Sequence, residues 1–218
     1  MKKLIVLAAA LASIVSVSAK TFEGHVDFIM KAGRDSMNIT YIMKDDRLRM
    51  EMSGKKGYSA IGLFDPKALE VKILMPQQKM YMSFPLDPAG AAAKAREVDI
   101  EETGETREIA GYTCRQFIFK DRKMVHEVWA TDELGRFVPM ADMQKTRGKA
   151  PAWARVLMDR ELFPLLMITK DRKGREKTRM EAQKVSPGKV DAAVFEVPEG
   201  YQPFSIPGIG NMLKGLGR

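Results

Sequence analysis

The first half of the chain alternates apolar and polar residues so regularly that it constrains the fold class. In TFEGHVDFIMK (residues 21–31), every second position from Phe22 to Met30 is apolar or glycine, and Glu23, His25 and Asp27 stand between them. A period of two places the two sets of side chains on opposite faces of a β-strand. Five further short runs, separated by glycine, proline and aspartate turns, have a similar strand character: MNITYIMK, LRMEMS, YSAIGLF, ALEVKIL and KMYMSF. Together they predict an antiparallel meander with one apolar face and one wet face.

The second half adds hairpins and helical segments. PLDPAGAAAKAREVD predicts a short alanine-rich helix, and a second helix follows Pro151, where Trp153, Val156 and Leu157 share a face. Residues 109–135 and 165–185 read as hairpins, and the second has a DRKG turn that suits a left-handed glycine at Gly174. We therefore expect a mainly β (α+β) fold: a curved antiparallel sheet or half-barrel of about ten strands, with two inserted helices covering its apolar face.

The chain begins with features of an export signal. MKKLIVLAAALASIVSVSA has two lysines, a short apolar run and a small-x-small ending at Ala19. The run is too short to span a bilayer comfortably, and Lys20 stands where a lipid-anchored protein would have cysteine. We expect a signal peptide at 1–19, a single β-rich domain at 20–204, a flexible glycine-rich tail at 205–218, and a periplasmic or secreted location.

The net charge of +8 bears on the choice of partner. Export makes nucleic acid an unexpected partner, so anionic lipid headgroups or envelope glycans are better candidates for a basic surface, with a merely solvated surface as the alternative. The basic hairpin KDRKGREKTR offers Arg172, Lys173 and Arg175 for headgroup or surface contact. A charged hairpin that protects a sheet edge explains the same residues.

Catalytic chemistry has few candidates in this sequence. The chain has one cysteine, Cys114, and two histidines, His25 and His126, with no glycine-rich phosphate loop. If the hairpin turns at residues 121–122 or 121–123, Cys114 lies opposite Trp129 or Ala130, and His126 lies roughly 10–13 Å along the strand from it. That separation is too long for a nucleophile–base pair or a shared metal, so we expect a buried thiol, with a redox-sensitive thiol as the alternative. We predict no enzyme activity, no catalytic residues and no cofactor.

Methionine is the residue type in excess, with 16 in the chain. Flexible methionine side chains adapt to apolar ligands of varied shape. Residues predicted to line a ligand cavity are Phe22, Phe28, Tyr41, Met50, Met52, Met80 and Met82. An ordinary methionine-rich core is the alternative, and a minor one is cuprous-ion binding, because MEM and MYM are Met-x-Met pairs.

Two segments resemble a known family. GETREIAGYTCRQFIFKDRKMVHEVWATDELG is similar to the I-x-G-Y-x-C hairpin of an exported bacterial domain of unknown function, number 4412, and DAAVFEVPEGYQPF resembles its closing F-x-x-P-x-G-Y segment. The resemblance implies a fold similar to the periplasmic lipoprotein carriers, in which helices cap an apolar cavity in a half-open barrel. It implies no catalytic residues.

These observations favour a non-enzymatic periplasmic binding protein that holds an acyl chain or another apolar ligand in a half-barrel cavity. Peripheral membrane contact accompanies this hypothesis. The alternative is an envelope protein-interaction or sensing module with a solid core. The sequence leaves the ligand, the partner and the oligomeric state open.

Overall fold

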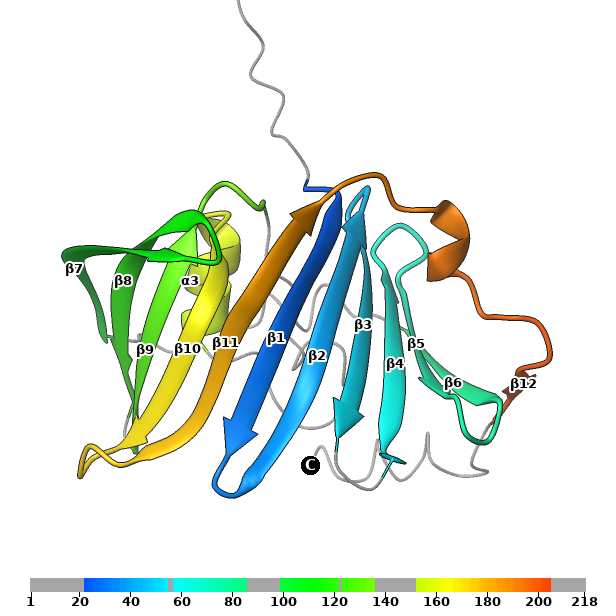
Figure 1. Ribbon diagram of the computed structural model, residues 1–218, viewed down its shortest axis with the longest axis horizontal. Helices are drawn as coiled ribbons and strands as arrows, with labels where there is room; N and C mark the ends of the chain where they lie inside the picture. The colour runs from blue at the N-terminus through cyan, green and yellow to red at the C-terminus, as the bar shows by residue number, and fades with distance from the viewer. Residues whose placement is uncertain (1–21, 55–56, 86–98, 122, 136–151, 205–218) are drawn as a thin grey trace, which may run out of the picture.

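A computed structural model describes residues 22–54, 57–85, 99–121, 123–135 and 152–204. The described part of the chain forms one large curved sheet (Figure 1). Its strands are β1 (Gly24–Ala32), β2 (Asp35–Lys44), β3 (Arg47–Gly54), β4 (Ser59–Asp65), β5 (Glu70–Met75), β6 (Met80–Pro85), β7 (Asp99–Ile109), β8 (Tyr112–Lys120), β9 (Met124–Thr131), β10 (Phe163–Asp171), β11 (Glu176–Pro187) and β12 (Gln202–Pro203). The mainly β prediction is confirmed, with twelve strands instead of about ten.

The sheet is open, with its strands in the order β12-β6-β5-β4-β3-β2-β1-β11-β10-β9-β8-β7. Neighbouring strands are antiparallel except for β12, which runs parallel to β6. The six strands of the predicted meander therefore lie side by side. Strand β11, which comes late in the sequence, pairs with the free edge of β1. Figure 1 shows this pairing at the centre of the sheet, where it joins the two hairpin series.

The predicted alternation is confirmed over most of the first half. Val26, Ile39, Tyr41 and Met50 lie on one face, and each is no more than 1% exposed. Leu69 departs from the pattern of the ALEVKIL run, since it precedes β5 in a turn and is 48% exposed. Register between antiparallel neighbours thus gathers the alternate apolar residues into a shared core.

The prediction of two covering helices is wrong for the described residues, which contain one α-helix, α3 (Ala152–Asp159), and one 3-10 helix, η2 (Ala192–Phe195). The alanine-rich helix predicted at 85–99 falls mostly on residues outside the described ranges. Helix α3 lies behind one end of the sheet (Figure 1). Leu157 of this helix packs with Phe117, Phe119 and Val128, and Met167 of β10 packs against the same cluster, so α3 covers only part of the second half of the sheet.

The other face of the sheet carries the segment that follows β11. Ile42 packs there with Val190 and Phe195. The Lys44 ammonium donates to the Val190 carbonyl at 2.7 Å and to Glu23 at 3.0 Å, while Glu23 accepts from the Val190 amide at 2.7 Å. The predicted signal peptide and the predicted tail lie outside the described residues.

Candidate functional site

The residues predicted to line a ligand cavity share one face of β1–β6. Register forms a row across six strands on this face, made of Val26, Tyr41, Met50, Gly62, Ile73 and Met82. Phe28 and Met52 lie in the next row, because both pair with Ile39. Met80 is two positions from Met82, and Phe22 packs against the same core just before β1. The predicted residues therefore lie on one face of the sheet, as the alternation indicated.

Burial divides these residues into two groups. Phe28, Tyr41 and Met50 are 2%, 1% and 1% exposed, so they form the interior of the core. Phe163 joins them, with ring centroids 6.3 Å from those of Phe28 and of Tyr41. Burial raises the pKa of the Tyr41 hydroxyl, which therefore stays protonated. These side chains are structural, and a ligand would have to contact other residues.

The second group is only partly buried. Phe22, Met52, Met80 and Met82 belong to it, and three of these four are methionines on β3 and β6. Other partly buried apolar residues that pack beside this core were missing from the predicted set: Met30, Met37, Phe64 and Ile73. The period-two pattern of their strands could have identified these residues from the sequence. No such pattern marks Phe163, because it opens a strand in a run of apolar residues without alternation.

The two Met-x-Met pairs are too far apart to share one cuprous ion. Met50 and Met52 lie on β3, whereas Met80 and Met82 lie on β6, three strand spacings away. At about 4.8 Å per spacing, the pairs are separated by roughly 14 Å. Among the described residues, no group of three or more histidine, cysteine, aspartate or glutamate side chains is placed to hold a metal ion.

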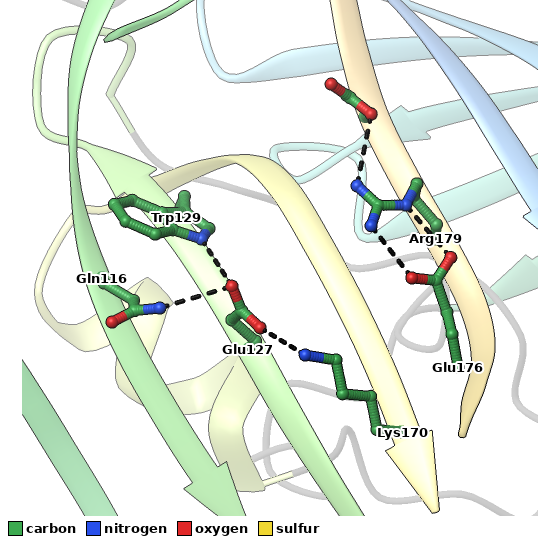
Figure 2. Close-up of polar contacts among 7 residues, drawn as sticks. Gln116, Glu127, Trp129, Lys170, Glu176 and Arg179 are labelled. Carbon is green, nitrogen blue, oxygen red and sulfur yellow. Dashed lines mark hydrogen bonds and ion pairs between the residues drawn. The ribbon is translucent and has the colours of Figure 1, made fainter. Parts of the chain in front are cut away.

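A polar cluster on the opposite face centres on Glu127 of β9 (Figure 2). Its carboxylate accepts hydrogen bonds from Trp129 Nε1 at 3.0 Å, Gln116 Nε2 at 3.3 Å and Lys170 Nζ at 2.9 Å. Burial, the largest single influence, raises the pKa of Glu127, but the bonds from Lys170 and Trp129 together outweigh it and leave the pKa below its usual range. A carboxylate held ionised by three donors is a structural anchor and a poor general acid.

Arg179 of β11 forms a second charged group near this cluster (Figure 2). It donates to both carboxylate oxygens of Glu176, at 3.0 and 2.9 Å, and its remaining nitrogen lies 3.5 Å from Glu181. The bond from Arg179 is the main reason that the pKa of Glu176 is lowered. The Glu127 cluster was not predictable from the sequence, because its members come from three strands, whereas the Arg179 group lies within β11 alone.

The hairpin that contains Cys114 is shifted from its predicted register. Gln116 lies opposite Trp129, and Arg115 lies opposite Ala130, so the predicted pairing of Cys114 with either residue is wrong. The Asp121 amide donates to the Met124 carbonyl at 3.0 Å, and the β8–β9 register is shifted by one or two residues from the predicted one.

The expected separation of Cys114 from His126 is confirmed, and it is larger than predicted. His126 faces Phe119, instead of Phe117 or Ile118, five residues or roughly 17 Å along the strand from Cys114. Burial, followed by the nearby Glu133 charge, raises the pKa of the Cys114 thiol to about 11. His126 instead lies 3.1 Å from the Thr169 hydroxyl. The buried-thiol interpretation fits this geometry.

The predicted headgroup-contact residues lie in the turn between β10 and β11. Arg172, Lys173 and Arg175 are exposed, and Gly174 has the predicted left-handed conformation with a φ of 75°. Asp171 accepts from Arg175 at 2.7 Å and lies 3.2 Å from Lys177. Burial of Asp171 raises its pKa, but the hydrogen bonds from Arg175 and Lys177 lower it by more.

Comparison with solved structures reveals a similar fold in an uncharacterised conserved protein from Thermus thermophilus. The TM-score is 0.51 at 8% identity, over 84% of this chain and 90% of that protein. Pseudomonas aeruginosa MucB, solved as a MucA/MucB complex, gives 0.43 at 11% identity, over 80% of this chain and 55% of the matched chain. A putative outer membrane lipoprotein-sorting protein domain from Vibrio parahaemolyticus gives 0.25 at 10% identity, over 88% and 90%.

No curated protein matches the chain. In the part of the chain that the structure describes, no helix is both long and apolar enough to cross a bilayer. The sequence motifs of the hairpin and of the closing segment identified the family correctly. A family model matches residues 22–201, and the chain belongs to this family, DUF4412, a domain of unknown function.

Proposed function

We propose that this protein is a non-enzymatic, periplasmic binding protein that holds an acyl chain or another apolar ligand against the apolar face of β1–β6. The observation that carries this proposal is the division of that face. Phe28, Tyr41 and Phe163 form a tightly packed aromatic core, while Met52, Met80 and Met82 on the same face keep part of their surface accessible.

Methionine suits this division of roles. A partly exposed leucine or phenylalanine presents one shape, whereas the unbranched thioether side chain of methionine adjusts to chains of different length and curvature. The aromatic core behind it keeps the sheet rigid, so a ligand meets mobile side chains on a fixed frame. The small pocket between Arg47, Phe64 and Phe195 does not offer this chemistry, since charged side chains (Arg47, Asp65, Glu70, Lys72 and Glu196) make up about half of its lining.

Adjacent residues of β6 provide a matched test. Met82 lies on the apolar face, and the next residue, Ser83, lies on the other face and is exposed. The assay is titration of the purified protein with a fluorescent fatty acid, after organic extraction to remove any bound lipid. Met82→Glu places a charge in the proposed contact surface and is expected to weaken binding at least about tenfold, because burial of an unpaired charge is costly. Ser83→Glu adds the same charge outside the surface and is expected to leave binding unchanged.

Native mass spectrometry of protein from the periplasm supplies the independent readout. The proposal predicts a bound species whose mass disappears after organic extraction. A clean apo mass together with no fatty-acid binding in the titration would instead favour an envelope interaction module with a solid core. Equal weakening by Met82→Glu and Ser83→Glu would also contradict the proposed surface.

A further inference from the structure

The antiparallel register gathers turns that are far apart in sequence at the same end of the sheet. Strands β1, β5, β8 and β10 all run toward this end, and β2, β6, β9 and β11 run away from it. The described residues of the turns between these strands are 33–34, 76–79, 121, 123 and 172–175. Figure 1 shows the β1–β2 and β10–β11 turns together at the lower edge of the sheet.

This end of the sheet, which we call the basic rim, has an excess of exposed cations. Its exposed lysine and arginine residues are Lys31, Arg34, Lys79, Lys123, Arg172, Lys173, Arg175 and Lys177. The carboxylates of Asp35, Asp121, Asp171 and Glu176 stand among them. Asp171 is paired with Arg175 and Lys177, Glu176 with Arg179, and Asp121 lies 3.5 Å from His126. Within the described ranges, Lys79, Lys123, Arg172 and Lys173 have no carboxylate at ion-pair distance. The rim therefore keeps a net positive charge that its own acids do not cancel.

The opposite end of the sheet has more exposed acids than bases in its turns, where Lys67 and Lys189 are the exposed lysines. Its turns contain the exposed acids Asp45, Asp46, Asp132 and Glu133. Strand β1 spans nine residues between the two ends, which corresponds to about 27 Å. That length is roughly three Debye lengths at physiological ionic strength, so an anionic surface that attracts the rim hardly senses the acidic end. The sheet is polarised along its strands.

An exposed aromatic side chain accompanies the cations. Tyr58, just before β4, is 55% exposed, and its carbonyl accepts from the Gly54 amide at 3.0 Å. The β3–β4 connection lies at the same end as the β1–β2 turn, because β3 runs parallel to β1. Tyrosine with a free ring is favoured at the boundary between bilayer headgroups and acyl chains. A soluble polyanion would use the cations alone and would gain little from this ring.

We propose that the basic rim, with Tyr58, is a docking surface for a bilayer that contains anionic phospholipid, with the strands standing roughly upright on the membrane. Lysine and arginine attract the headgroup phosphates, and the Tyr58 ring enters the headgroup region. This docking requires no ligand on the apolar face of β1–β6, so its test is independent of the test of the proposed function.

The test is cosedimentation of the full chain with vesicles of phosphatidylcholine alone and of phosphatidylcholine mixed with phosphatidylglycerol. Binding is expected only to the mixed vesicles and is expected to weaken as salt is added. The double variant Arg172→Gln/Lys173→Gln is expected to lose roughly 10- to 30-fold in affinity, from the usual contribution of two cations near an anionic surface. Lys67→Gln/Lys189→Gln makes the same change in net charge at the acidic end and is expected to bind like the wild type.

Tyr58→Ser separates a membrane from other polyanions. It is expected to weaken vesicle binding while leaving the salt dependence unchanged, because the ring carries no charge. Three results would overturn the proposal: equal losses in the two double variants, equal binding to vesicles without phosphatidylglycerol, or binding to heparin as tight as to vesicles with no effect of Tyr58→Ser. Fatty-acid binding that persists in the rim variants would show that docking and the ligand surface are distinct.

Discussion

Removal of the Glu127 carboxylate gives the sharpest test of how the second half of the sheet is stabilised. The side chain is 18% exposed and serves donors from three strands, including the indole of Trp129, which is itself 6% exposed. Glu127→Ala leaves that buried indole N–H without its acceptor. Glu127→Gln keeps a carbonyl oxygen in nearly the same place and removes only the charge.

The expected magnitudes follow from burial. An unsatisfied buried donor costs about 1–3 kcal/mol, and the Lys170 ion pair adds about 0.5 kcal/mol, since the Lys170 side chain is 36% exposed. We therefore expect Glu127→Ala to lower the free energy of unfolding by about 2–3 kcal/mol and Glu127→Gln by about 1 kcal/mol. Glu105→Gln in the exposed part of β7 is the matched control, with an expected change near zero.

The assay is urea unfolding of the wild type and the variants between pH 7 and pH 3. The pKa of Glu127 is lower in the folded chain than its ordinary value of 4.5, so the carboxylate stabilises the fold above that pH. This stabilisation is lost as the pH falls through the folded pKa, and the difference between wild type and Glu127→Gln is expected to shrink over the same range. Equal losses for Ala and Gln, or a difference independent of pH, would refute this role for Glu127.

Two further predictions concern turns and the thiol. Gly174→Ala is expected to cost about 1 kcal/mol, because Gly174 has a φ of 75°, whereas Gly188→Ala meets no atom within 4 Å and is expected to be nearly neutral; urea unfolding of both variants checks this. Cys114 is expected to resist a thiol-reactive disulfide reagent at pH 8 in the folded protein and to react within seconds in denaturant, because it is buried and its pKa is raised to about 11; fast labelling of the folded protein would revive the redox interpretation.

The sequence predicted the meander well because each strand signals its own two faces. In β2 and β3, alternation placed Ile39, Tyr41 and Met50 on the buried face, and tight turns fixed the pairing between neighbours. It failed where burial does not alternate. Leu63 and Leu74 are buried on the face that was expected to be wet, and both stand in apolar runs without alternation, at residues 60–64 and 73–75.

The sequence predicted which face of the sheet carries the candidate residues, but not how deeply each of them is buried. Alternation says which way a side chain points, whereas exposure depends on elements from elsewhere in the chain. Phe163 arrives from β10, about 120 residues after Tyr41, and its ring fills the space beside Tyr41 and Phe28. Three of the seven predicted lining residues are core residues because of contacts with other strands, which the sequences of their own strands do not reveal.

The Cys114 hairpin shows how a small error in register changes the chemistry inferred from a sequence. A register shifted by one or two residues pairs Cys114 with Trp129 or Ala130 and suggests a thiol packed on an indole. The actual register pairs Gln116 with Trp129, and both then reach the Glu127 carboxylate, at 3.3 and 3.0 Å. Since a shift of one residue exchanges the two faces of a strand, such a shift would turn Gln116 away from Glu127 and remove this bond from the polar cluster. The Gln116–Glu127 bond therefore supports the observed β8–β9 register together with the turn, whereas the bonds from Trp129 within β9 and from Lys170 on β10 do not depend on that register.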